Sequence, residues 1–465
     1  MKYIVSRAAT AALLSLGLLT ISCDKKLDIE PEQSIDATTA LSDQPGIQTA
    51  VTGAYSRLYT PGLYGTNLIL LPDLLASTGY LAWQGTFQSY REMTQAQITT
   101  VNADALRTWR EAYRSINIAN LVLEALPRVT FTQTALRDQY EGEMLLMRGL
   151  MHFELVRLYG QPSITSNLGV PVVTKANSTV ADASQKLPRA TVREVYDQIL
   201  SDMNAAATKL PEEAETGRFD QYDAKALLAR VHLQLGEYAR ARDLANEVIN
   251  GSGATLNPSV LDAFTGGGSA EVLFEVLQNE QNNAGTANDG LATFYSGKSV
   301  GFQGRADVAV SAAFAGQYGA NDKRGEQPVI GEGLIYLGDA VRANVRRSFK
   351  WNDPAQDIPV IRLAEMYLIR AEGNARLGTS VGAAPLSDIN ELRLRADATP
   401  LGSVTLNEVL QERDLELAFE GFRIHDYRRT SRTINNVPAT DQTRVLPIPQ
   451  YEINLNNALP QNPGY

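Results

Sequence analysis

The spacing of apolar residues between positions 136 and 158 limits the possible folds of this chain more than any other feature. Apolar side chains recur there at steps of four and three residues: Tyr140, Met144, Met147, Met151, Leu155 and Leu158. These steps place the side chains on one face of an α-helix, and Gly160 and Pro162 supply its stop signal. A helix with a long apolar face must pack against other elements, so we predict an all-α scaffold.

Two capping boxes mark the starts of further helices. In each box a Thr precedes a Glu by three residues, so that the side chains satisfy each other's free backbone N–H groups: Thr191 with Glu194, and Thr405 with Glu408. The first box predicts a helix that ends at Pro211, and the second predicts a helix that runs to about Glu420.

Two helical patterns, at 222–235 and 237–249, flank Gly236. The run around this Gly resembles the tetratricopeptide pattern, in which small residues let two antiparallel helices approach while large residues fill the groove. We therefore expect tetratricopeptide-like helical hairpins, stacked side by side, within 105–250 and 358–430.

Residues 251–350 have a different character. Sixteen of the 35 Gly fall between 251 and 340, and helical periodicity is weak there. Such a stretch is long for a loop in a compact domain, and long irregular segments often carry function. We predict an irregular, Gly-rich, ligand-facing lobe with a few short strands, and a smaller segment of the same kind at 61–104.

Residues 1–22 have the features of an export signal, with a basic start followed by 14 uncharged residues. Cys23, the only Cys in the chain, comes directly after this run, which is the pattern of a bacterial lipoprotein. We expect a lipid anchor on Cys23 and a tether over 23–45 that leads into one domain at 46–465. An ordinary secretory signal with an incidental Cys is the alternative.

The composition excludes several classes of function. Lys and Arg number 42 against 52 Asp and Glu, a net charge of −10, so the chain lacks the basic surface that a nucleic-acid partner requires. A single Cys excludes a disulfide framework and a Cys-based zinc site. His152, His232 and His425 are far apart in sequence, so we expect no metal and no other cofactor.

Several motifs follow one another in the order of a known family. They are Leu27-Asp28 with Pro31, Arg148-Gly149, His152-Phe153-Glu154, Pro188-Arg189-Ala190-Thr191, Ala226-Leu227-Leu228, Glu365-Met366-Tyr367, Glu412-Arg413-Asp414-Leu415-Glu416, Pro447-Ile448-Pro449 and Gln461-Asn462-Pro463-Gly464-Tyr465. Together they cover essentially the whole mature chain, which resembles the SusD/RagB family of outer-membrane lipoproteins.

This resemblance implies a nutrient-binding protein that lipid holds on the outer membrane, at the surface of a Bacteroidota cell. It implies a SusC-like TonB-dependent transporter as partner, to which the protein passes glycans, and it implies no enzyme activity. Three alternatives stay open: a peptide-binding member of the same family, a helical-toroid glycoside hydrolase, and an assembly scaffold that binds protein helices.

A glycan binder needs flat aromatic rings and side chains that hydrogen-bond to hydroxyl groups. Trp83 lies in an irregular polar stretch, where it can form a ligand platform or pack under a loop, whereas Trp109 follows the helical pattern and is assigned to the core. The regions that the resemblance marks as ligand-facing supply the other candidates: Asp73, Tyr80, Phe87, Tyr295, Phe302, Arg305 and Trp351. Trp351 precedes a turn sequence, and packing on the scaffold is the favoured interpretation for it.

Glu412, Glu416 and Glu420 recur at steps of four residues on one helical face. A glycosidase would need two carboxylates at a defined separation across a cleft. An ion-pair network is the stronger interpretation, and it would lower the pKa values of these carboxyl groups. The expected partners are the nearby arginines Arg413, Arg423, Arg428 and Arg429.

Overall fold

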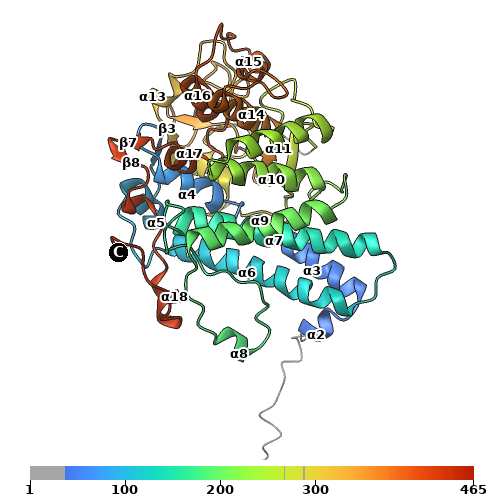
Figure 1. Ribbon diagram of the computed structural model, residues 1–465. Helices are drawn as coiled ribbons and strands as arrows, with labels where there is room; N and C mark the ends of the chain where they lie inside the picture. Colours follow the sequence, from blue (N-terminus) through green and yellow to red (C-terminus); the bar gives the residue numbers. More distant parts are fainter. Residues whose placement is uncertain (1–36, 266–267, 286–287) are drawn as a thin grey trace, which may run out of the picture.

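The computed structural model describes residues 37–265, 268–285 and 288–465 (Figure 1). The predicted export signal, Cys23 and most of the tether lie outside the described residues. Helices dominate and the strands are short, which confirms the prediction of an all-α fold with a few strands. Helix α2 covers Ala37–Ala40 and α3 begins at Gln44, so helical structure starts inside the segment that we expected to be tether.

The scaffold is a stack of long helices (Figure 1). Its members are α3 (Gln44–Arg57), α6 (Ala103–Ala125), α7 (Thr134–Tyr159), α9 (Val192–Lys209), α10 (Gln221–Gln234), α11 (Tyr238–Gly251), α14 (Leu363–Leu377), α15 (Pro385–Arg395) and α16 (Leu406–Glu416). Each member contacts the next one in this order. The contact between α11 and α14 joins the two regions, 105–250 and 358–430, in which we predict hairpins. Buried apolar side chains form one large core cluster in the stack and a second, smaller cluster between α14, α15 and α16.

Shorter helices lie around this stack. They are α4 (Asn67–Leu75), α5 (Gln88–Gln95), η2 (Leu126–Arg128), α8 (Val180–Ala183), α12 (Leu291–Tyr295), α13 (Ala312–Ala315), α17 (Arg423–Arg429), η3 (Gln442–Arg444) and α18 (Gln450–Leu455). Within the ranges that the structure describes, no helix combines the length and the apolar character needed to cross a membrane.

The strands of the described residues form antiparallel pairs. These are β1 (Leu81–Trp83) with β3 (Val308–Val310), β2 (Val272–Val276) with β6 (Ile358–Arg362), β4 (Ile335–Leu337) with β5 (Arg346–Ser348), and β7 (Thr433–Ile434) with β8 (Val437–Pro438). Most of the described part of the lobe at 251–350 has no regular structure, as its glycine content predicts.

The local helix signals are confirmed at their starts. Helix α7 contains the predicted apolar face, and both capping boxes form, at Thr191 and at Thr405. The expected end of the last scaffold helix was wrong, because α16 ends at Glu416. The backbone enters the left-handed region at Phe419 (φ 67°) and Gly421 (φ 80°), which stops the helix before Glu420.

Small residues bring α11 and α14 close together. A Cβ atom at Gly373 in α14 would lie 2.7 Å from the Cβ of Arg242 and 2.9 Å from the backbone oxygen of Tyr238, both in α11. We expect Gly373→Ala to lower the free energy of unfolding by about 1–3 kcal/mol, because backbone must shift to make room. Urea unfolding monitored by circular dichroism measures the change.

Gly53→Ala is the matched control for this variant. Gly53 also lies inside a helix, but a Cβ atom there meets nothing within 4 Å. Ala is the better helix former, so Gly53→Ala should stabilise the protein by about 0.5–1 kcal/mol. If Gly373→Ala also stabilises the protein, the close approach of α11 and α14 is not a structural requirement.

Candidate functional site

The pairing of β1 with β3 joins the two irregular segments that the sequence singles out. Leu81 lies opposite Val310 and Trp83 opposite Val308. The ladder continues beyond the strands, because the backbone N–H of Gln84 donates a 2.7 Å hydrogen bond to the backbone oxygen of Asp307. Residues near Trp83 therefore lie beside residues near Arg305, although the two segments are far apart in sequence.

An aromatic cluster forms on the β1 side of this junction. The Trp83 ring centroid is 4.7 Å from that of Tyr90 and 5.3 Å from that of Phe294. Phe87 contacts the same two rings at 6.2 and 6.1 Å. Tyr90 and Phe294 are buried, whereas Trp83 and Phe87 are half-buried and reach the surface. The indole Nε1 of Trp83 has no hydrogen-bond partner among the described residues.

Two arginines and one carboxylate lie on the β3 side. Arg305 Nε donates to Asp307 Oδ2 at 2.9 Å, and Arg342 Nη1 donates to Asp307 Oδ1 at 2.7 Å. The Arg305 guanidinium lies 4.9 Å from the centroid of the Phe87 ring, which connects the charged and aromatic groups. The Asp307 side chain is buried, but those of Arg305 and Arg342 are each 31% exposed.

These groups line an open surface hollow of about 340 Å³, which we call the arginine hollow. Its lining residues are Gln303, Gly304, Arg305, Asp307, Val341 and Arg342. Because both Asp307 oxygens accept from arginines, the carboxylate fixes the two guanidinium groups. The remaining N–H groups of such a pair suit hydroxyl or carboxylate oxygens, and the adjacent Phe87 ring offers an apolar face.

The structure brings three of the candidates together, namely Trp83, Phe87 and Arg305. Phe302 is half-buried on the loop that leads to Arg305, and its backbone oxygen accepts a 2.7 Å hydrogen bond from the Ser296 hydroxyl. Sequence reasoning missed Asp307 and Arg342. The only signal for Asp307 was the short apolar run of β3 that follows it, and nothing in the sequence around Arg342 marks a site.

The other four candidates are buried, with 0–1% of each residue exposed, as the favoured packing interpretation of Trp351 predicts: Asp73, Tyr80, Tyr295 and Trp351. The Tyr80 ring stacks on Phe419 with 5.3 Å between centroids, and Trp351 Nε1 donates to the backbone oxygen of Phe419 at 2.8 Å. All four residues contact the turn after α16 and do not reach the surface in this structure. Trp109 is buried, as the helical pattern predicts.

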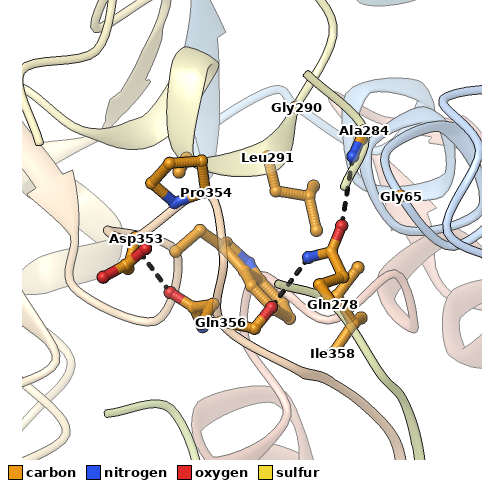
Figure 2. A pocket seen from close by; sticks show the side chains of 11 residues that line it. Gly65, Gln278, Ala284, Gly290, Leu291, Asp353, Pro354, Gln356 and Ile358 are labelled. Carbon is orange, nitrogen blue, oxygen red and sulfur yellow. Dashed lines mark hydrogen bonds between the residues drawn. The ribbon is translucent and has the colours of Figure 1, made fainter. Parts of the chain in front are cut away.

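The cavity beside Trp351 is too small to be a binding site. It measures about 10 Å³, enough for at most one water molecule. Figure 2 shows that amide side chains bridge it, with Gln278 donating to the backbone oxygen of Gln356 at 2.7 Å. The amide oxygen of Gln278 accepts from the backbone N–H of Ala284 at 3.1 Å.

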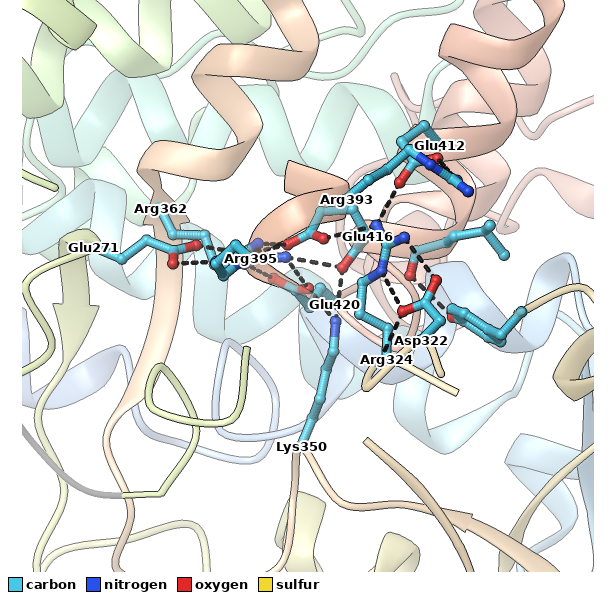
Figure 3. Close-up of polar contacts among 12 residues, drawn as sticks. Glu271, Asp322, Arg324, Lys350, Arg362, Arg393, Arg395, Glu412, Glu416 and Glu420 are labelled. Carbon is cyan, nitrogen blue, oxygen red and sulfur yellow. Dashed lines mark hydrogen bonds and ion pairs between the residues drawn. The ribbon is translucent and has the colours of Figure 1, made fainter. Parts of the chain in front are cut away.

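The acidic residues of α16 and of the turn after it form the predicted ion-pair network, but with other partners (Figure 3). Glu412, Glu416 and Glu420 pair with cations from distant parts of the chain: Arg324, Lys350, Arg362, Arg393 and Arg395. The expected partners Arg413 and Arg429 bind Asp426 instead. The sequence could not locate the true partners, because they come from the lobe, β6 and α15.

The network makes these carboxylates unsuitable as general acids. Burial alone would raise the pKa of Glu416, but Arg395, Arg362 and Arg324 hold it well below its usual range. Burial opposes ionisation of Glu420 in the same way, and Arg362 and Lys350 lower its pKa. A glycosidase acid needs a raised pKa and an open cleft, whereas the side chains of Glu416 and Glu420 are buried and have lowered pKa values.

Two family profiles match the chain. One, described as starch-binding and associating with the outer membrane, matches residues 27–233, and the SusD family profile matches residues 348–437. The chain belongs to the SusD/RagB family. SusD-like protein P38 of Formosa agariphila is 25% identical to it, over 91% of this chain and 90% of that protein. The starch-binding protein SusD of Bacteroides thetaiotaomicron is 36% identical over 24% of this chain and 22% of its own length.

Solved structures agree with this SusD/RagB assignment. A SusD superfamily protein from Bacteroides thetaiotaomicron superposes with a TM-score of 0.78 at 26% identity, covering 90% of this chain and 99% of that one. A protein described as a putative sugar binding protein, from Bacteroides vulgatus, has a TM-score of 0.79 at 24% identity, covering 90% and 98%, and it shows the shared fold. The family binds carbohydrate and is associated with the outer membrane.

Proposed function

We propose that this protein captures an oligosaccharide or polysaccharide at the cell surface and delivers it to a SusC-like TonB-dependent transporter. Cys23 carries the lipid that holds the protein on the outer membrane. The glycan binds at the arginine hollow and the neighbouring rings of Trp83 and Phe87. The protein binds the glycan and does not cleave it.

The juxtaposition of aromatic and hydrogen-bonding groups at the β1–β3 junction carries this proposal. A Cβ atom at Gly85 would lie 2.6 Å from the Trp83 ring and 2.7 Å from the Asp307 carboxylate, so these two side chains are close neighbours. A pyranose has an apolar C–H face and a rim of hydroxyl groups. The rings suit the first, and the guanidinium groups of Arg305 and Arg342 suit the second.

Binding without cleavage agrees with the way in which arginines hold the Asp307 carboxylate at this site. Both oxygens of Asp307 accept from arginines, and among the described residues no second acidic side chain lines the arginine hollow. Hydrolysis of a glycoside ordinarily needs two carboxyl groups on opposite sides of the bond. Incubation with soluble starch should therefore release no new reducing ends.

Arg305→Ala is expected to weaken glycan binding about tenfold, because it removes charge-assisted hydrogen bonds to sugar hydroxyls. Affinity gel electrophoresis with soluble starch as the first probe, followed by other neutral polysaccharides, measures the change. Arg193→Ala is the matched control, since Arg193 is a surface arginine on α9, away from the site, with a side chain 58% exposed. Retained binding by Arg305→Ala would remove the arginine hollow from the site.

Trp83→Ala is a less selective test than the sequence suggests. Because the Trp83 ring packs on Tyr90 and Phe294, its removal is expected to lower stability as well as binding.

Binding of a peptide library in place of every polysaccharide would favour the peptide-binding alternative. Binding of neither class would favour the assembly scaffold.

A further inference from the structure

A third, partly open cavity lies where α17 meets the ends of α7, α9 and α10. Its volume is about 70 Å³, which is room for about five water molecules. Its lining comes from these four helices and the turn after α7: Val156, Arg157, Gly160, Gln161, Pro162, Val192, Tyr196, Gln234, His425, Arg428 and Arg429. Three guanidinium groups and no carboxylate of the described residues line it.

Arg428 is the least compensated charge at this cavity. The residue is 7% exposed, and its guanidinium donates to the backbone oxygens of Arg157, Ala439 and Arg444. In the part of the chain that the structure describes, it forms no ion pair, whereas Arg429 is paired with Glu372 and Asp426. A buried cation without a counter-charge is unfavourable, and burial lowers the pKa of Arg428 to about 10.

His425 faces the same cavity with unused hydrogen-bonding capacity. It is 2% exposed, and neither ring nitrogen has a hydrogen-bond partner among the described residues. Burial, together with Arg157, Arg428 and Arg230, holds the pKa of His425 well below its usual range, so the ring is neutral and carries one N–H donor.

Arg157 supplies another free donor. Its Nη2 donates to both oxygens of Glu154, at 2.5 and 2.6 Å, but its Nε has no acceptor within the described ranges. Buried polar groups without partners are rare in folded proteins, and two such residues that line one cavity point to a missing acceptor. The acceptor must carry negative charge if it is also to compensate Arg428.

We propose that this cavity binds one small inorganic oxyanion, such as sulfate or phosphate. The Nε–H of Arg157 and the N–H of His425 donate to its oxygens, and the charge of Arg428 compensates the anion. An acidic sugar offers the same negative charge, but a pyranose ring is too large for a space of about 70 Å³. The site is separate from the arginine hollow, so it does not depend on the proposed glycan function.

The three histidines allow a direct test, because the purified protein labelled with 15N-histidine gives few imidazole signals. Sodium sulfate or phosphate should shift the His425 signals saturably, with those of His152 and His232 unchanged. Sodium chloride at equal ionic strength and sodium glucuronate should have no such effect. His425→Asn assigns the signals.

Arg428→Gln should weaken sulfate binding about tenfold, since it removes the uncompensated charge. Arg193→Gln, at the exposed face of α9, should leave sulfate binding unchanged. The wild-type titration alone decides the question if Arg428→Gln does not fold. Absence of a saturable His425 shift, an equal effect of chloride, or a parallel drift of all three histidines would overturn the proposal and leave a water-filled cavity.

Discussion

Glu416→Gln should lower the free energy of unfolding by about 3–5 kcal/mol, the largest loss that we expect from a single substitution that keeps side-chain shape. The Glu416 carboxylate is 3% exposed and pairs with Arg362 at 2.8 Å, Arg395 at 2.5 Å and Arg324 at 3.1 Å (Figure 3). Gln removes the negative charge and leaves these buried cations undercompensated.

The network of Glu416 also connects the lobe to the helical scaffold. Asp322 and Arg324 come from the lobe, and Arg324 bridges to Glu412 at 2.6 Å as well as to Glu416. Lys350, at the end of the lobe, donates to the backbone oxygen of Glu416 at 2.9 Å and pairs with Glu420 at 2.6 Å. Loss of the central carboxylate should therefore loosen the lobe first.

Urea unfolding of wild type and Glu416→Gln at neutral pH measures this loss. Glu247→Gln is the control, because Glu247 pairs with Lys225 on the surface and its side chain is 47% exposed. A surface ion pair contributes at most about 1 kcal/mol, so this variant should unfold close to wild type. Equal midpoints for the two variants would show that the buried network adds nothing beyond a surface pair.

Helices could be predicted from the sequence because their signals are local. The apolar face of α7 and the capping boxes at Thr191 and Thr405 lie within a few residues of the elements that they define. Even the error at the end of α16 has a local cause, since the left-handed backbone at Phe419 is unusual for a residue with a Cβ atom.

The site depends on contacts between distant segments, which limits what a sequence can tell. The segment of Trp83 lies beside the segment of Arg305 because β1 pairs with β3. These strands are too short to be recognised from the alternation of apolar and polar residues. Tyr80, Tyr295 and Trp351 are of the residue types that bind glycans, but the turn at Phe419 covers them. Aromatic residues in irregular segments mark both sites and cores, and tertiary contacts decide between them.

Asp73 is a buried carboxyl group whose titration should have a large effect on stability. Its side chain is almost fully buried, and Oδ2 accepts from the Tyr80 hydroxyl and from the backbone N–H of Gly421, each at 3.4 Å. Oδ1 has no partner among the described residues. Burial is the main cause that raises the pKa of Asp73 from 3.8 to about 7, against the opposing effects of Gly421 and Arg423.

Asp73→Asn should therefore stabilise the protein increasingly as the pH rises. Between pH 4 and 7 the unfolded wild type loses the Asp73 proton while the folded state keeps it, so the contribution of this group to stability is full in acid and falls as pH rises through this window. Asn has no such titration. Its advantage over wild type should grow by about 3 kcal/mol between pH 5 and pH 8.

Paired urea unfolding curves at pH 5 and pH 8 measure this growth, and comparison with wild type at each pH removes the effect of every other titrating group. Asp197→Asn is the control, because the Asp197 side chain is 54% exposed on α9 and should show no such growth. The same difference between Asp73→Asn and wild type at both pH values would mean that folded Asp73 is already ionised at pH 5. The backbone N–H of Gly421 and the charge of Arg423 would then outweigh burial in setting the state of this carboxyl group.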